Sequence, residues 1–147
     1  MDNDTLRRLS DVEEIKQLKA RYLRHVDTKD WDAWREVFTS DARLEVGGVT
    51  RTPDAFVAVT RGWLGEAVSV HAGHMPEIEI TSSDTATGVW AMQDYIAFPA
   101  NGEAPQGMRG YGHYHEQYRR VDGRWRIQTM TLTRLRIDLF EGGLPDV

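Results

Sequence analysis

In the stretch "TATGVWAMQDYIAF", residues Thr85–Phe98, every second residue from Ala86 onward is apolar, apart from Asp94. This period predicts a β-strand with one face packed on a core. The preceding segment "EIEIT", residues 77–81, reads as a second strand, and the polar turn Ser82-Ser83-Asp84 joins the two in an antiparallel hairpin. The residues predicted to share the inner face of the long strand are Ala86, Gly88, Trp90, Met92, Asp94, Ile96 and Phe98.

Strand patterns continue to the end of the chain. "MRGYGHYHEQYRRV" and "RWRIQTMTLTRLRI" meet at Asp122-Gly123, a dipeptide typical of tight hairpins. "APQG" and its neighbours predict a loop of about ten residues before them. A shorter strand, "ARLEV", ends at Gly47-Gly48.

Helical patterns dominate the first part of the chain. Ser10 and Glu13 form a capping box, which predicts a helix starting there. A second helix follows Asp30, and Thr52 with Pro53 predicts a third over roughly Pro53 to Ala67. The buried stripe of the first helix is predicted to be Val12, Ile15, Leu18, Tyr22 and Val26. Helices followed by a curved antiparallel sheet indicate an α+β fold, in one domain of 147 residues with a core over about 10–138.

Composition excludes several classes of function. The chain has no cysteine, so disulfides and thiolate chemistry are excluded. A formal net charge of -5 with no basic run argues against a nucleic-acid partner. No apolar run approaches membrane-spanning length, and the N-terminus lacks a signal-peptide pattern. We therefore expect a cytoplasmic protein without membrane contact.

Several polar residues fall on faces predicted to be apolar. Asp94 interrupts the inner face of the long strand, and Arg134 continues the face of Met130 and Leu132. Tyr22 brings a hydroxyl group onto the helix stripe. A carboxylate on an apolar face is costly unless it is paired.

Each of these residues also has a purely structural interpretation. Asp94 could pair with Arg134 for stability alone, Tyr22 could be a core aromatic, and Asp27 could be a turn residue at a helix end. His113 and His115 share a face with Tyr111 that is predicted to be partly solvated. The aromatic residues Trp31, Trp34 and Phe38 are predicted to be core.

Taken together, the set suits proton transfer. His71 and His74 lie in "SVHAGHMPEIEI", just before the strand predicted from Glu77. A neutral histidine backed by a carboxylate is a working base, and a tyrosine donates a proton or steadies an oxyanion. No nucleophile motif or phosphate-binding loop is present.

Three segments carry a resemblance to a known family. "IKQLKARYLRHVDTKDWDAW", "HAGHMPEIEITSSDTATGVWAMQD" and "YRRVDGRWRI" resemble the SnoaL-like branch of the nuclear transport factor 2-like superfamily. Within it, the chain is most similar to the bile acid 7α-dehydratase group, and more distantly to scytalone dehydratase and hexachlorocyclohexane dehydrochlorinase. The resemblance implies a cone, in which a curved sheet wraps round three N-terminal helices, an apolar pocket, and a homo-oligomer, either a trimer or a dimer.

The resemblance also implies site residues and a reaction. The catalytic residues of the dehydratases fall on Tyr22, Asp27, His71, Asp94 and Arg134, with Asp94 supporting His71. The implied activity is a lyase of the dehydratase type without a cofactor or metal, acting on a hydroxylated, largely apolar carbonyl compound such as a steroid, terpenoid or polyketide. The segments "PANGEAPQGMRG" and "DLFEGGLPDV" depart from the bile acid enzymes, so the resemblance bears on the chemistry more than on the substrate.

Three alternatives remain open from the sequence. The same acid and base could isomerise a double bond or close a ring. His71, His74, His113 and His115 could bind a metal. The chain could also be a small-molecule binding domain without catalytic activity. In the dehydratase hypothesis, His74 anchors the start of the strand through a hydrogen bond.

Overall fold

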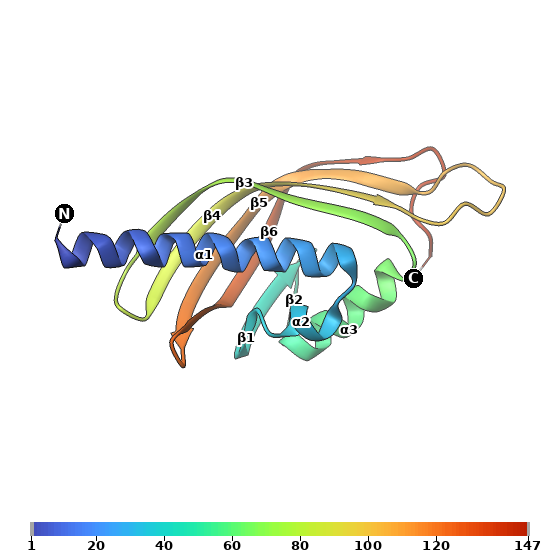
Figure 1. Ribbon diagram of the computed structural model, residues 1–147. Coiled ribbons are helices and arrows are strands. Elements are labelled where there is room, and N and C mark those ends of the chain that lie inside the picture. The colour runs from blue at the N-terminus through green and yellow to red at the C-terminus, as the bar shows by residue number, and fades with distance from the viewer. Residues whose placement is uncertain (1, 147) are drawn as a thin grey trace.

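The computed structural model describes residues 2–146, which form three helices and six strands within that range. Figure 1 shows the long N-terminal helix against a strongly curved sheet that extends both above and below it in this view. In chain order the elements are α1 (Asn3–Thr28), α2 (Trp31–Arg35), β1 (Phe38–Val46), β2 (Val49–Arg51), α3 (Pro53–Leu64), β3 (Val68–Ile80), β4 (Thr85–Ala97), β5 (Gly107–Val121) and β6 (Arg124–Leu139).

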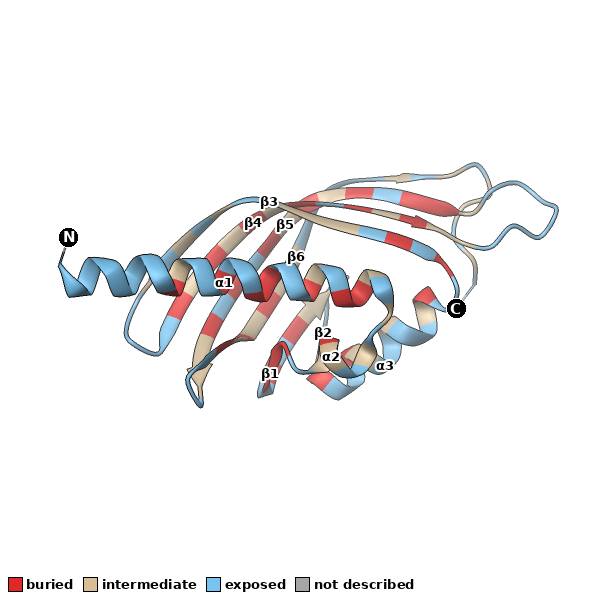
Figure 2. Ribbon diagram, in the orientation of Figure 1, coloured by how far each residue is buried: buried red, intermediate tan, exposed pale blue. Residues whose placement is uncertain are grey.

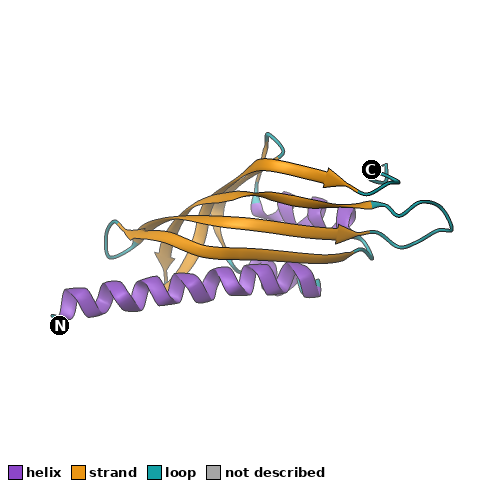
Figure 3. Cartoon of the chain, turned by 90° about the horizontal axis from the view of Figure 1, so that it is seen from above, coloured by secondary structure: helices purple, strands orange, loops and turns teal. Residues whose placement is uncertain are grey.

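The strands form one open sheet in the order β2-β1-β6-β5-β4-β3. Helix α1 runs along the concave side, and α2 and α3 lie below its C-terminal end (Figures 1 and 3). The predicted α+β fold with a curved sheet is therefore confirmed. The sheet is not wholly antiparallel, because β1 pairs in parallel with β6. The sequence pattern of β1 predicts a strand but carries no information about which edge it joins.

The predicted inner faces are the buried ones. Alternate residues of β4 from Ala86 to Ile96 point inward, and burial colours alternate along the strands in Figure 2. The turn between β5 and β6 contains Asp122 and Gly123, both with positive φ (52° and 77°). Such φ values match the twist of a two-residue hairpin, so this prediction is also confirmed.

Helix α1 begins earlier than the sequence predicted. Its N-cap is Asp2, whose carboxylate accepts from the Thr5 N–H at 2.7 Å, so Ser10 and Glu13 lie inside the helix. The capping box is thus not the helix start, because a cap nearer the terminus satisfies the first free N–H groups. At the other helices, Asp30 and Thr52 cap as predicted. Helix α3 ends at Leu64 rather than near Ala67.

Strand β3 also begins earlier than predicted. It starts at Val68, so His71 lies within the strand and not before it. The end of α1 is fastened to the segment leading into β3, since Lys29 Nζ donates to the carbonyls of Gly65 and Ala67 at 2.9 and 2.6 Å. This contact brings the last turn of α1 beside the first residues of β3. No helix in the described part of the chain has the length and hydropathy needed to cross a membrane.

Candidate active site

A cavity of about 330 Å³ lies between α1, α2, α3 and the concave face of the sheet. Most of its lining is apolar or aromatic, which is typical of small-molecule sites. Four of the five residues implied by the resemblance line it, and Asp27 lies behind one of them. The lining residues are Tyr22, Val26, Trp34, Val46, Arg51, Phe56, Val59, Thr60, Trp63, Leu64, His71, Asp94, Ile96, Tyr114, Leu132 and Arg134.

His71 is held by Asp27 at the end of α1. Its ring Nδ1 lies 2.7 Å from Asp27 Oδ1, and its backbone N–H donates to Asp27 Oδ2 at 2.8 Å. Ser69 Oγ donates to the same carboxylate at 3.0 Å. Because a carboxylate accepts here, we assign the ring proton to Nδ1, which leaves the lone pair of Nε2 free.

Asp94 is held by Arg134 on the floor of the cavity. Arg134 Nη1 and Nη2 donate to the two oxygens of Asp94 at 2.6 and 2.9 Å, a bidentate ion pair. Gly110 leaves the space for this pair, because a Cβ there would fall on the Arg134 Nη1 and Asp94 Oδ1 atoms. Asp94 is buried, so an unpaired charge at this place would be costly.

The structure corrects the partner of the histidine. The resemblance implied that Asp94 supports His71, but Nδ1 contacts Asp27 and both Asp94 oxygens are engaged by Arg134. His71 and Asp94 stand opposite each other in the β3–β4 register, with Nε2 of His71 4.0 Å from Asp94 Oδ2. The two aspartates therefore differ in role: Asp27 orients the imidazole, and Asp94 faces the free nitrogen.

Two phenols also contribute polar groups to the lining. Tyr22 and Tyr114 pack edge to face with ring centroids 5.7 Å apart. Burial, and then the neighbouring Tyr114 and the carboxylates of Glu116 and Asp94, raise the pKa of Tyr22 well above its usual value. Burial likewise raises the pKa of Tyr114. Both groups are therefore neutral hydroxyls near pH 7 and keep an O–H group that can donate a hydrogen bond. Sequence reasoning did not identify Tyr114, although the alternation of β5 places it on the inner face.

A second polar cluster, which sequence reasoning also missed, lies deeper. Lys19 Nζ donates to Glu116 Oε2 at 2.6 Å, and both side chains are fully buried. The ammonium sits 3.6 and 3.5 Å from the ring centroids of Tyr22 and Tyr114. Burial lowers the pKa of Lys19 to about 8, against the opposing effect of Glu116. We call the set Lys19, Glu116, Tyr118 and Trp90 the buried ion-pair cluster.

The other histidines lie away from the cavity. His74 pairs with Ala91 in the β3–β4 register, which puts it on the outer face of the sheet, opposite to His71. It is exposed in the middle of β3, so the prediction that it anchors the start of the strand is wrong. His113 and His115 share the same outer face, as predicted. In the part of the chain that the structure describes, no three His, Asp or Glu side chains group to hold a metal.

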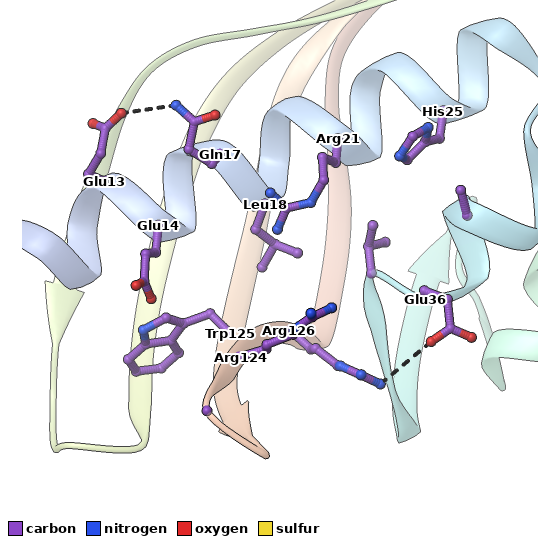
Figure 4. A pocket seen from close by; sticks show the side chains of 13 residues that line it. Glu13, Glu14, Gln17, Leu18, Arg21, His25, Glu36, Arg124, Trp125 and Arg126 are labelled. Atoms are coloured by element: carbon purple, nitrogen blue, oxygen red, sulfur yellow. Dashed lines mark hydrogen bonds and ion pairs between the residues drawn. The ribbon is translucent and has the colours of Figure 1, made fainter.

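A larger hollow lies elsewhere, between α1 and the β5–β6 turn. It measures about 750 Å³, and Figure 4 shows the many charged side chains in its lining. Some of these neutralise each other, as Arg126 does with Glu36 at 3.9 Å. We place the candidate site in the smaller cavity, because there the free nitrogen of His71 meets a mostly apolar lining, whereas the hollow lined by His25 carries many charged side chains.

Comparison with known proteins identifies the family. The sequence profile described as SnoaL-like domain matches residues 7–131. The chain belongs to the SnoaL-like domain family. This confirms the family that the sequence resembles, and residues Tyr22 to Asp94 of the candidate site all fall inside the matched range, while Arg134 follows it.

Solved structures share the fold at low sequence identity. A candidate scytalone dehydratase from Novosphingobium aromaticivorans DSM 12444 superposes with a TM-score of 0.82 at 17% identity, over 93% of this chain and 92% of that one. A type 2 hexachlorocyclohexane dehydrochlorinase, LinA, gives 0.79 at 18% identity over 97% of each. The Kfla4162 protein from Kribbella flavida gives 0.80 at 26% identity, over 88% and 93%. At such identities the likeness establishes the fold of this SnoaL-like protein.

Proposed function

We propose that this SnoaL-like protein is a lyase of the dehydratase type that needs no cofactor. The observation that carries the proposal is the orientation of His71, whose Nδ1 is fastened to Asp27 while Nε2 is free beside the cavity. Two SnoaL-like-fold neighbours named for elimination chemistry, a candidate scytalone dehydratase and a dehydrochlorinase, support the same class.

The proposed reaction is the loss of water from a β-hydroxy carbonyl compound. His71 Nε2 removes the proton from the carbon next to the carbonyl, and the C–H electron pair forms the enolate. The enolate then expels the hydroxyl group, which takes a proton from the Tyr22 phenol and leaves as water. The proton on His71 returns to Tyr22 through solvent, so the net products are an unsaturated carbonyl compound and water.

Asp94 and Arg134 are proposed to orient the substrate oxygen. Two guanidinium N–H groups are engaged by Asp94. A guanidinium has five such donors, so Arg134 retains donors for the enolate oxygen. Asp27 orients His71 and stabilises the imidazolium that forms.

The substrate is proposed to be largely apolar and compact. The cavity volume of about 330 Å³ is at the lower end of small-molecule sites, which favours a small terpenoid, polyketide or aromatic-derived ring system over a tetracyclic steroid. We propose that the relation to the bile acid 7α-dehydratase group concerns the catalytic residues and not the substrate. A homo-oligomer, trimer or dimer, remains a prediction that light scattering in solution would test.

A substrate search with matched variants tests the proposal. Wild type, His71→Ala and His74→Ala are incubated with a panel of β-hydroxy ketones, and mass spectrometry records the loss of water. His74 is the control, because it lies on the same strand but on the opposite face. We expect turnover by wild type and His74→Ala, and a loss of about 10² to 10⁴-fold in His71→Ala. Equal turnover by all three would refute the role of His71. Products with shifted double bonds or new rings would favour an isomerase or cyclase, and binding without turnover a non-catalytic domain.

A further inference from the structure

Arg51 is a cation inside the cavity that the proposed reaction does not use. It lies on β2, and the β1–β2 register pairs it with Leu44, which is fully buried. Paired residues of an antiparallel ladder share a face, so Arg51 projects from the inner face of the sheet. There it lines the cavity together with Thr60 and Trp63 of α3.

No carboxylate of the described residues lies within ion-pair distance of Arg51. The acidic residues nearest in sequence are engaged elsewhere. Asp54 accepts from Arg35 Nε at 2.8 Å, and Glu45 accepts from Thr131 Oγ1 at 3.5 Å. Arg51 is thus a half-buried guanidinium whose charge no protein group in the described chain neutralises.

The charge balance of the cavity follows from this pairing. Asp94 and Arg134 cancel each other within one bidentate ion pair. Arg51 is left as a net positive charge among apolar side chains such as Val46, Val59 and Trp63. A cation partly removed from water is stabilised by an anion that enters with the ligand.

Topology separates this charge from the reacting centre. Arg51 lies on β2 and His71 on β3, which are the two edges of the sheet. In a flat sheet, five interstrand spacings would part them by about 24 Å. The sheet is strongly curved (Figures 1 and 3), and Arg51 and His71 both line the one cavity although their strands are opposite edges of the sheet.

We propose that the ligand of this cavity carries a carboxylate that binds Arg51, while its apolar body extends toward His71. This inference deepens the proposed function, since it rests on the same cavity being the substrate site. Arg51 would then select substrates by a group remote from the bond that breaks. Binding energy from such a remote group is what holds a substrate in a reactive position.

The test compares a charged probe with its neutral counterpart. Calorimetric titrations measure the dissociation constants of 2-naphthoate and 2-naphthamide, which have nearly the same shape. We expect wild type to prefer the carboxylate by about tenfold or more. Arg51→Gln should bind the two equally, with unchanged affinity for the amide. Arg51→Lys should keep part of the preference, because it keeps the charge.

Controls locate the effect and separate it from catalysis. Arg43→Gln, on the neighbouring strand and outside the cavity lining, should keep the full preference, as should His71→Ala. The proposal is overturned if wild type does not bind 2-naphthoate or shows no preference for it over the amide. It is also overturned if Arg51→Gln keeps the preference while Arg134→Gln loses it, since the carboxylate would then bind Arg134. A lost preference says nothing against the dehydratase proposal, which depends on the turnover difference between wild type and His71→Ala.

Discussion

The cavity site and the buried ion-pair cluster both place titratable side chains inside the fold. The cavity site leaves one of them free to react, whereas the cluster encloses all of them. In the cavity, His71 has one nitrogen bound to Asp27 and the other free beside an open space. In the cluster, Lys19 is closed off by Glu116 and two aromatic rings. Tyr118 donates to Glu116 Oε1 at 2.7 Å, and Trp90 donates to Tyr118 at 2.9 Å, so the network continues inward. Of these two groups of side chains, only the cavity site leaves a titratable nitrogen without a hydrogen-bond partner, and this difference makes it the candidate reactive site.

The largest effect on activity is expected from Asp27→Asn. The amide nitrogen of asparagine can donate to His71 Nδ1, which moves the ring proton to Nε2 and removes the free lone pair. We expect kcat/KM to fall by about 10² to 10⁴-fold with little change in thermal unfolding. Ser69→Ala, which removes only one hydrogen bond to Asp27, should have a much smaller effect. Full activity in Asp27→Asn would show that the hydrogen bond from Asp27 to His71 does not prepare the base, and the contrast between the cavity site and the cluster would fail.

In the buried ion-pair cluster, a substitution should reduce stability rather than activity. Lys19→Met leaves the Glu116 carboxylate buried without its counter-ion, and we expect the free energy of unfolding to fall by about 3 to 5 kcal/mol. Lys19→Met combined with Glu116→Gln should recover most of that loss, because no charge remains in the buried ion-pair cluster. Denaturant unfolding measures both variants. A double variant as unstable as the single one would mean that the ammonium contributes packing rather than charge.

Gly110→Ala probes the second ion pair of the cavity. A methyl group there collides with the Arg134 and Asp94 atoms that pair, so we expect activity to fall by roughly tenfold or more and stability to fall by about 1 to 3 kcal/mol. Gly62→Ala is the control, since nothing lies within 4 Å of its Cβ position. An active Gly110→Ala enzyme would show that the pair is needed for neither orientation nor charge.

The smallest effect is a pH dependence of stability. The pKa of Lys19 is lowered to about 8 by burial, from 10.5. Between these values the unfolded chain binds the proton and the folded chain does not, so this group makes stability rise with pH. The raised pKa values of Tyr22, Tyr114 and Tyr118 act in the opposite direction above pH 10, their ordinary value.

The contribution of Lys19 to this pH dependence is obtained by comparing the unfolding free energies of wild type and a variant without the lysine. From about pH 8 to pH 10, the unfolding free energy of wild type should rise relative to Lys19→Met/Glu116→Gln, which has no lysine to titrate there. Chemical unfolding at a series of pH values measures it. Parallel curves for the two proteins would contradict a lowered pKa at Lys19.

Some of this arrangement was predictable from the pattern of single elements. Asp94 and Arg134 were recognised because each interrupts an apolar face of period two, and the structure pairs them. Lys19 and Glu116 carry a similar signal, since Lys19 lies between Leu18 and Tyr22 near the helix stripe and Glu116 alternates with buried tyrosines. Charged residues are usually exposed, so this pattern alone does not predict a buried ion pair.

The sequence by itself determined the α+β order, the hairpin at Asp122-Gly123 and the inner faces of the strands, because side-chain periodicity and turn preferences are local properties. Only the tertiary structure decided that Asp27 rather than Asp94 holds His71, and that β1 lies parallel to β6. It also decided that Arg51 reaches the cavity of His71 from the far edge of the sheet. Each of these depends on how the sheet curves over α1, and curvature is set by the packing of residues far apart in the chain.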